Sequence, residues 1–102
     1  MLFKERIKQL RESSQIPQRV LAAALEIDTA TYCKIEKGER KAKREQVLVI
    51  ARMLKTNKEE LLSLWLADKV TAVVVDEKKI ANKVLEMAKD NIRDEQARTR
   101  YE

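Results

Sequence analysis

The 102-residue chain contains no histidine and a single cysteine, Cys33. The absence of histidine removes the commonest general base and the commonest metal ligand. With one cysteine, a zinc site would have to be built from carboxylates alone, and an internal disulfide is excluded. The neighbouring carboxylates Glu59–Glu60 and Asp94–Glu95 lie in polar stretches and are interpreted as solvated surface. We therefore expect no catalytic residues, no bound metal, no cofactor and no enzymatic activity.

Glycine and proline each occur once, at Gly38 and Pro17, and aromatic residues make up 4% of the chain. So few turn-forming residues disfavour β-hairpins, and Val, Ile and Thr do not alternate with polar residues over any long run. No apolar run approaches the roughly 18 residues of a membrane span, and the first residues lack the apolar core of a signal peptide. We predict an all-α fold and a cytoplasmic location.

Charge of both signs is abundant but unevenly placed. Charged residues make up 38% and hydrophobic residues 44% of the chain, which is typical of a helical protein with a charged surface. Residues 1–58 contain 14 Lys and Arg against 7 Asp and Glu, a net charge of +7. Residues 59–102 contain 8 against 10, a net charge of −2. This asymmetry indicates an anionic partner for the N-terminal part.

Apolar residues recur at helical spacing along most of the chain, which predicts six helices. Pro17 is placed in the first turn of the second helix, and Asp28 and Asn57 are the expected N-caps of the third and fifth. Gly38 is the residue best suited to the left-handed conformation that ends the third helix. The predicted helices span residues 3–14, 17–26, 28–37, 44–54, 57–73 and 76–92, and a frayed charged tail is expected after the last.

The helix predicted over residues 28–37 has two different faces. Tyr32 and Ile35 point inward, and a rotation of 100° per residue then places short side chains on the outward face. The outward residues are Thr29, Ala30, Cys33 and Lys34. A helix in the major groove of DNA needs small residues near its N-terminus, which can approach base edges, and a longer donor that reaches further. A string of cations follows this helix directly, at Lys37, Arg40, Lys41, Lys43 and Arg44.

Residues 3–61 resemble the lambda-repressor-like helix-turn-helix family, also called the Cro/C1 or XRE type. Four motifs carry the resemblance and occur in the order that the family has. They are IKQLRE from Ile7, Q-x-x-L-A from Gln18, Y-x-K-I-E-K-G from Tyr32 and I-A-x-x-L from Ile50. The resemblance implies a five-helix DNA-binding domain over residues 1–67, followed by a helical extension over residues 68–102.

The resemblance also assigns roles to individual residues. The family places recognition contacts at the positions of Thr29, Ala30 and Lys34, and Cys33 joins the predicted base-contacting set because it shares their face. The loop after the third helix runs beside the sugar–phosphate backbone in this family, where each neutralised phosphate releases counterions. The family also has a residue near phosphate or a base at the start of the second helix. The predicted phosphate-contacting residues are Gln18, Arg19, Lys37, Arg40, Lys41, Lys43 and Arg44.

The family pairs an arginine of the first helix with a glutamate of the third, and Arg11 and Glu36 hold these positions. We predict that they form a structural pair. Three other residues depart from the family pattern. Pro17 stands where a capping serine is common, and Gln15 and Glu26 stand where glycine is common. If Gln15 and Glu26 adopt positive φ, each carries strain on the order of 1 kcal/mol.

The sixth helix adds apolar surface that a five-helix domain does not need. Additions of this kind commonly pair two subunits in the family, so we expect a homodimer, with packing of residues 76–92 on their own domain as the alternative. A twofold dimer would place two recognition helices about 34 Å apart and would bind a palindromic site.

The resemblance therefore predicts a sequence-specific transcriptional regulator that binds double-stranded DNA. Two other interpretations remain open at this point. One is an antitoxin-like protein that grips a partner toxin through residues 59–102. The other is a controller protein of a restriction–modification system, a small member of the same family.

Overall fold

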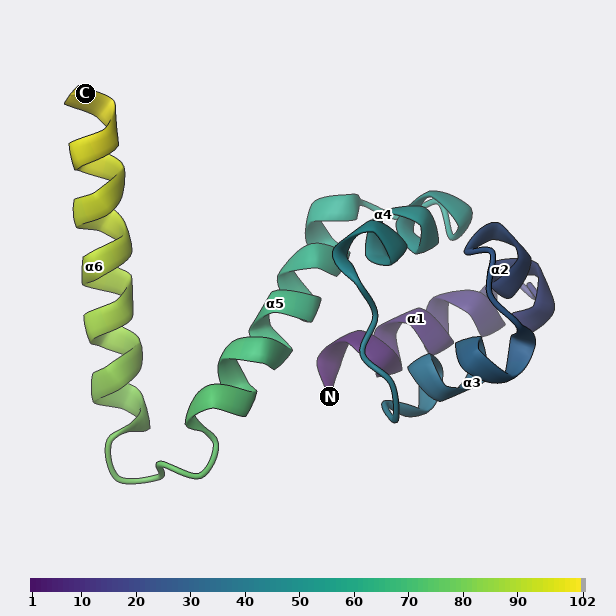
Figure 1. Cartoon of the computed structure of the whole chain (residues 1–102), viewed down its shortest axis with the longest axis horizontal. Coiled ribbons are helices and arrows are strands. Elements are labelled where there is room, and N and C mark those ends of the chain that lie inside the picture. Colours follow the sequence, from purple (N-terminus) through teal and green to yellow (C-terminus); the bar gives the residue numbers. More distant parts are fainter. Residues whose placement is uncertain (102) are drawn as a thin grey trace. The chain divides into compact units, whose positions relative to one another are not determined.

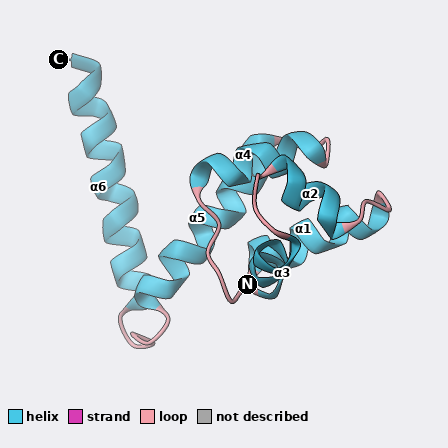
Figure 2. Ribbon diagram, turned by 45° about the vertical axis from the view of Figure 1, so that its right-hand side comes forward, coloured by secondary structure: helices cyan, strands magenta, loops and turns pink. Residues whose placement is uncertain are grey.

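The computed structural model describes the backbone of residues 1–101 and the side chains of residues 1–98. The described chain forms helices and connecting turns, and no strand occurs within it (Figure 1, Figure 2). The helices are α1 Leu2–Ser13, α2 Gln18–Ala24, α3 Thr29–Lys37, α4 Arg44–Met53, α5 Lys58–Val74 and α6 Ala81–Tyr101. The predicted all-α fold class is thus confirmed.

The chain divides into two compact units, which are described separately. Unit 1 spans Met1–Lys69 and contains α1 to α4 with most of α5, and unit 2 begins at Val70. In unit 1, α3 packs against both α1 and α2, and α2 also packs against α4. Apolar side chains from all five helices and the loop before α4 meet in one core. Its buried members are Phe3, Ile7, Leu21, Ala22, Tyr32, Ile35, Ala42, Val47, Ile50, Ala51, Leu54 and Leu61.

The second helix is shorter than predicted at both ends. Pro17 has extended backbone angles, φ −66° and ψ 150°, so it is the residue before the helix and does not lie in the first turn. At the other end, Leu25 is the last residue with helical angles, because Glu26 takes a left-handed conformation with φ 58°. The helix therefore ends at Ala24, two residues before the predicted Glu26.

The first four helices are all followed by a residue in the left-handed conformation. After α1, for example, the Gln15 N–H donates to the Glu12 carbonyl and the Ile16 N–H to the Arg11 carbonyl, both at 3.1 Å. This pair of bonds is a Schellman motif, and it recurs after α2, α3 and α4. The left-handed residues and their φ angles are Gln15 (55°), Glu26 (58°), Gly38 (81°) and Lys55 (53°). Only one of the four is glycine, and the sequence pattern gave no indication of Lys55.

We expect glycine to stabilise the protein at each of the three strained positions. A left-handed L-residue costs about 1–2 kcal/mol, and the entropy that glycine loses on folding offsets about 0.5–1 kcal/mol of the gain. Gln15→Gly, Glu26→Gly and Lys55→Gly should each raise the free energy of unfolding by about 0.5–1 kcal/mol, measured by urea denaturation. Ser14→Gly is the matched control, because Ser14 has φ −88° and its replacement should destabilise. A loss of stability in all three variants would contradict the strain argument.

In unit 2, the last helix begins later than predicted. Residues 75–80 form turns, and the N–H groups of Ile80 and Ala81 both donate to the Glu77 carbonyl, at 3.1 and 2.8 Å. The helix therefore starts at Ala81, five residues after the predicted start at Asp76.

The last helix also continues further than predicted. Ion pairs three residues apart, Arg93 with Asp90 and Arg98 with Glu95, lie along the segment that was expected to be a frayed charged tail. Such pairs stabilise an isolated helix, and α6 extends to Tyr101. Glu102, the end of the predicted tail, lies outside the described residues.

Candidate nucleic-acid interface

The turn between α2 and α3 is short and closed by local hydrogen bonds. Asp28 is the N-cap of α3, and its Oδ1 accepts a hydrogen bond of 2.7 Å from the Thr31 N–H. Hydrogen bonds from the Thr31 side chain and from its N–H lower the pKa of Asp28, because they are made to the ionised carboxylate. Ile27, which follows the left-handed Glu26, packs on the core. The orientation of α3 relative to α2 is thus fixed from both sides of the turn.

The two faces of α3 differ sharply in exposure. Tyr32 and Ile35 are buried in the core. The predicted base-contacting residues Thr29, Ala30 and Lys34 are all exposed. Cys33, assigned to the same face from the sequence, is half-buried, because it lies at the edge between the two faces. The exposed strip of α3 therefore consists of two short side chains followed by one long cation.

A buried ion pair joins α1 to α3. Arg11 donates from Nε to Glu36 Oε2 at 2.7 Å and from Nη2 to Glu36 Oε1 at 3.0 Å, and a third bond of 3.0 Å reaches the Ile16 carbonyl. The two side chains are 14% and 3% exposed. Burial acts to raise the pKa of Glu36, but hydrogen bonds and the charge of Arg11 outweigh it and hold that pKa below its usual value.

Two neighbouring polar groups complete this buried cluster. Gln18 Nε2 donates a long hydrogen bond of 3.4 Å to Glu36 Oε1, so the first residue of α2 is tied to α3. The Tyr32 hydroxyl is buried and forms no hydrogen bond of normal geometry with the described residues. Burial and the nearby Glu36 carboxylate raise the pKa of Tyr32, so it stays neutral. The cluster holds α1, α2 and α3 together from the side of the core.

The loop between α3 and α4 presents its cations to solvent. All five predicted phosphate-contacting residues of this region are exposed: Lys37, Arg40, Lys41, Lys43 and Arg44. Between them Ala42 is buried, so the chain turns one small side chain inward and the charged ones outward. Figure 1 shows this loop running from the end of α3 to the start of α4. Five exposed cations therefore follow one another between the last turn of α3 and the start of α4, with one exposed carboxylate, Glu39, among them.

Gly38, at the end of α3, lies next to the flexible Lys4 side chain. Lys4 Nζ donates to the Lys37 carbonyl at 3.3 Å, and a Cβ on Gly38 would lie 2.8 Å from Lys4 Cδ. The Lys4 side chain can move aside, so the positive φ of Gly38 is the main reason for glycine at this point, immediately before the basic loop.

The two predicted phosphate contacts on α2 differ. Arg19 is exposed in the first turn of the helix. Gln18 is half-buried, and its amide is turned towards Glu36. Pattern reasoning missed the contacts that hold the surface from behind, which come from Lys4, Gln46 and Trp65. Their partners are backbone carbonyl and N–H groups, which leave no signal in the order of side chains.

A model described as a helix-turn-helix domain matches residues 3–64, which is more than half of the chain. The protein therefore belongs to the helix-turn-helix domain family, in agreement with the resemblance identified from the sequence. A comparison with curated proteins found no match, and a comparison with solved structures found none. Helix-turn-helix domains bind DNA through the second of their two helices. DNA binding is therefore the function class to which the protein belongs.

Within the described residues, no helix combines the length and the apolar character needed to cross a membrane.

Proposed function

We propose that the protein is a sequence-specific transcriptional regulator of the XRE type, which binds double-stranded DNA and catalyses no reaction. The observation that carries the proposal is the exposed strip Thr29, Ala30 and Lys34 lying directly before an exposed basic loop. A groove-reading helix needs short side chains at its start, and a phosphate-binding segment beside it sets register and orientation. Both requirements are met by consecutive segments of one chain.

The proposal gives α3 and the basic loop different roles, so substitutions in the two segments should have different effects on DNA binding. Lys41→Ala and Lys43→Ala should weaken binding to specific and random DNA alike, and each should reduce the salt slope by about 0.9 because one phosphate contact is lost. Lys34→Ala should instead relax base preference, at a cost of about 1–3 kcal/mol at the base it contacts. Selection from a random DNA pool supplies the specific site, and fluorescence anisotropy at several salt concentrations measures affinity.

Lys78→Ala is the matched control for loss of one positive charge, because Lys78 is exposed in the turns before α6. We expect it to leave both the base preference and the salt slope unchanged. If Lys34→Ala also weakened binding to specific and random DNA equally, as Lys41→Ala should, the assignment of α3 to the major groove would be wrong.

We further propose that the protein acts as a homodimer on a palindromic operator, paired through unit 2. Several apolar side chains of this unit are exposed, with 78% of Val73, 62% of Met87 and 57% of Ile92 accessible to solvent. Exposed apolar surface of this kind favours association. A second copy is the simplest occupant, because a twofold dimer presents two copies of α3 to successive turns of one face of DNA.

A further inference from the structure

Both ends of the basic loop are fixed by the helices that they join. At the start, the N–H groups of Glu39 and Arg40 donate to the Lys34 carbonyl, at 2.9 and 3.2 Å. At the end, the Lys43 N–H donates to Gln46 Oε1 at 2.9 Å, which satisfies one of the free N–H groups at the start of α4. These contacts are local and do not involve Ala42, in the middle of the loop.

The middle of the loop is held by α5. Trp65 donates from its indole Nε1 to the Ala42 carbonyl at 2.9 Å, across 23 residues of sequence. The Ala42 side chain is 6% exposed and belongs to the core, so both its methyl group and its carbonyl are fixed. The ammonium group of Lys69 lies 3.8 Å from the centroid of the Trp65 ring. This cation–π contact from the next turn of α5 restrains the indole.

We propose that Trp65 is a positioning residue for DNA binding, which acts through Ala42 and makes no contact with DNA itself. Lys41 and Lys43 are the immediate neighbours of Ala42 and point to solvent, so the carbonyl that Trp65 holds lies between two phosphate-contacting side chains. A loop fixed before binding loses less conformational freedom when it docks on the DNA backbone. This inference rests on the proposed function, because it assigns a role in that same interface.

The test removes the indole N–H and keeps the aromatic ring. Trp65→Phe, and a variant carrying β-(3-benzothienyl)alanine, which has the size of tryptophan but no N–H, should bind specific and random DNA about three- to tenfold more weakly. The ratio of the two affinities should stay unchanged, because α3 is untouched. A structural role alone would lower thermal stability without weakening binding at temperatures where every variant is folded. Equal affinity of the folded variants and the unaltered protein would overturn the proposal.

Amide hydrogen exchange in the free protein separates this proposal from the proposed function. Loss of the indole N–H should accelerate exchange at Arg40 and Lys43, whose hydrogen-bonded N–H groups lie on either side of the segment that Trp65 holds, above the rate set by global unfolding. Asp68→Asn is the matched control: Asp68 lies on the same helix and accepts hydrogen bonds of 2.9 Å from the N–H groups of Leu2 and Phe3. It should reduce stability while leaving loop exchange and DNA affinity unchanged.

Two failures can be told apart. Unchanged loop exchange in the Trp65 variants would overturn the positioning role and leave the proposed function intact. Failure of the unaltered protein to bind any duplex from the random pool would overturn the proposed function instead, whatever the exchange rates are.

Discussion

Arg11→Ala should lower the free energy of unfolding by about 3–5 kcal/mol, because it leaves the Glu36 carboxylate buried without its partner. The Glu36 side chain is 3% exposed, so water cannot replace the three bonds that Arg11 makes in this cluster. Small domains are stable by only about 5–15 kcal/mol, and the loss is a large fraction of that. Urea unfolding, followed by circular dichroism and by the fluorescence of Trp65, measures the change.

Arg6→Ala is the matched control, since Arg6 also lies on α1 and also pairs with a glutamate. Its contact with Glu60 is 3.3 Å long, but the two side chains are 35% and 47% exposed. Exposed pairs of this kind contribute about 0.2–1 kcal/mol. If Arg11→Ala cost no more than Arg6→Ala, the buried pair would have no special part in the fold.

The Arg11–Glu36 pair also makes stability depend on pH in a defined direction. Folding lowers the pKa of Glu36, so the folded protein binds its proton less tightly than the unfolded chain does. The ionised Glu36 carboxylate therefore contributes its full stabilisation of the folded protein above the ordinary glutamate pKa of 4.5. This contribution is lost as the pH falls through the lower pKa that Glu36 has in the folded protein. Glu36→Gln should be less stable than the unaltered protein near neutral pH, and the difference should shrink in acid.

The sequence predicted the core better than it predicted the ends of helices. Apolar spacing identified Tyr32 and Ile35 as inward-facing, and both are buried, because burial imposes the helical period directly on the sequence. Helix ends depend on backbone conformation, which glycine usually reveals. Glu26 and Lys55 both adopt left-handed angles, although neither is glycine. Glu26 stands where the family commonly has glycine, but nothing in the sequence indicated Lys55. The later start of α6 has a similar cause, since backbone bonds to Glu77 fix it.

In the candidate site, too, the sequence predicted the positions of side chains better than contacts to the backbone. The exposed strip of α3 follows from helix geometry once the buried side is known, and only Cys33 was placed too far outward. The charge of the loop is equally visible in the sequence. The contact between Trp65 and the Ala42 carbonyl is not, because it joins a side chain to a backbone atom 23 residues away.

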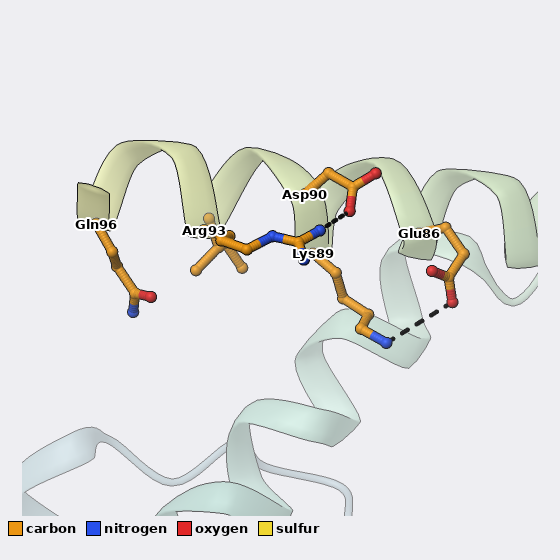
Figure 3. A pocket seen from close by; sticks show the side chains of 6 residues that line it. Glu86, Lys89, Asp90, Arg93 and Gln96 are labelled. Carbon is orange, nitrogen blue, oxygen red and sulfur yellow. Dashed lines mark hydrogen bonds and ion pairs between the residues drawn. The ribbon is translucent and has the colours of Figure 1, made fainter. Parts of the chain in front are cut away.

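Loss of the proposed dimerisation carries the largest expected effect on DNA binding. Two linked half-sites bind as one unit, and the second contact becomes intramolecular, so loss of pairing should reduce operator affinity by about 10²–10⁴-fold. Ile92 is the residue to change, because it is 57% exposed and lies beside a shallow hollow on α6. Figure 3 shows the ion pairs Lys89–Glu86 and Arg93–Asp90 lining this hollow. An exposed apolar residue with paired charges on one side of it is typical of an interface core that borders its polar rim.

Ile92→Glu should therefore yield a monomer in sedimentation equilibrium, because a buried, unpaired carboxylate would oppose pairing. Affinity for the full palindrome should fall by about 10²–10⁴-fold, whereas affinity for a single half-site should change little, since α3 and the basic loop are intact. Ala97→Glu adds the same charge five residues further along α6, about 140° around the helix, and should leave both properties unchanged.

A dimer that persists in Ile92→Glu would place the pairing surface elsewhere, and an unaltered protein that is monomeric at micromolar concentration would refute pairing through unit 2. Stable capture of a different, co-encoded protein by unit 2 would favour the antitoxin-like interpretation, because the same exposed apolar side chains would then serve that partner.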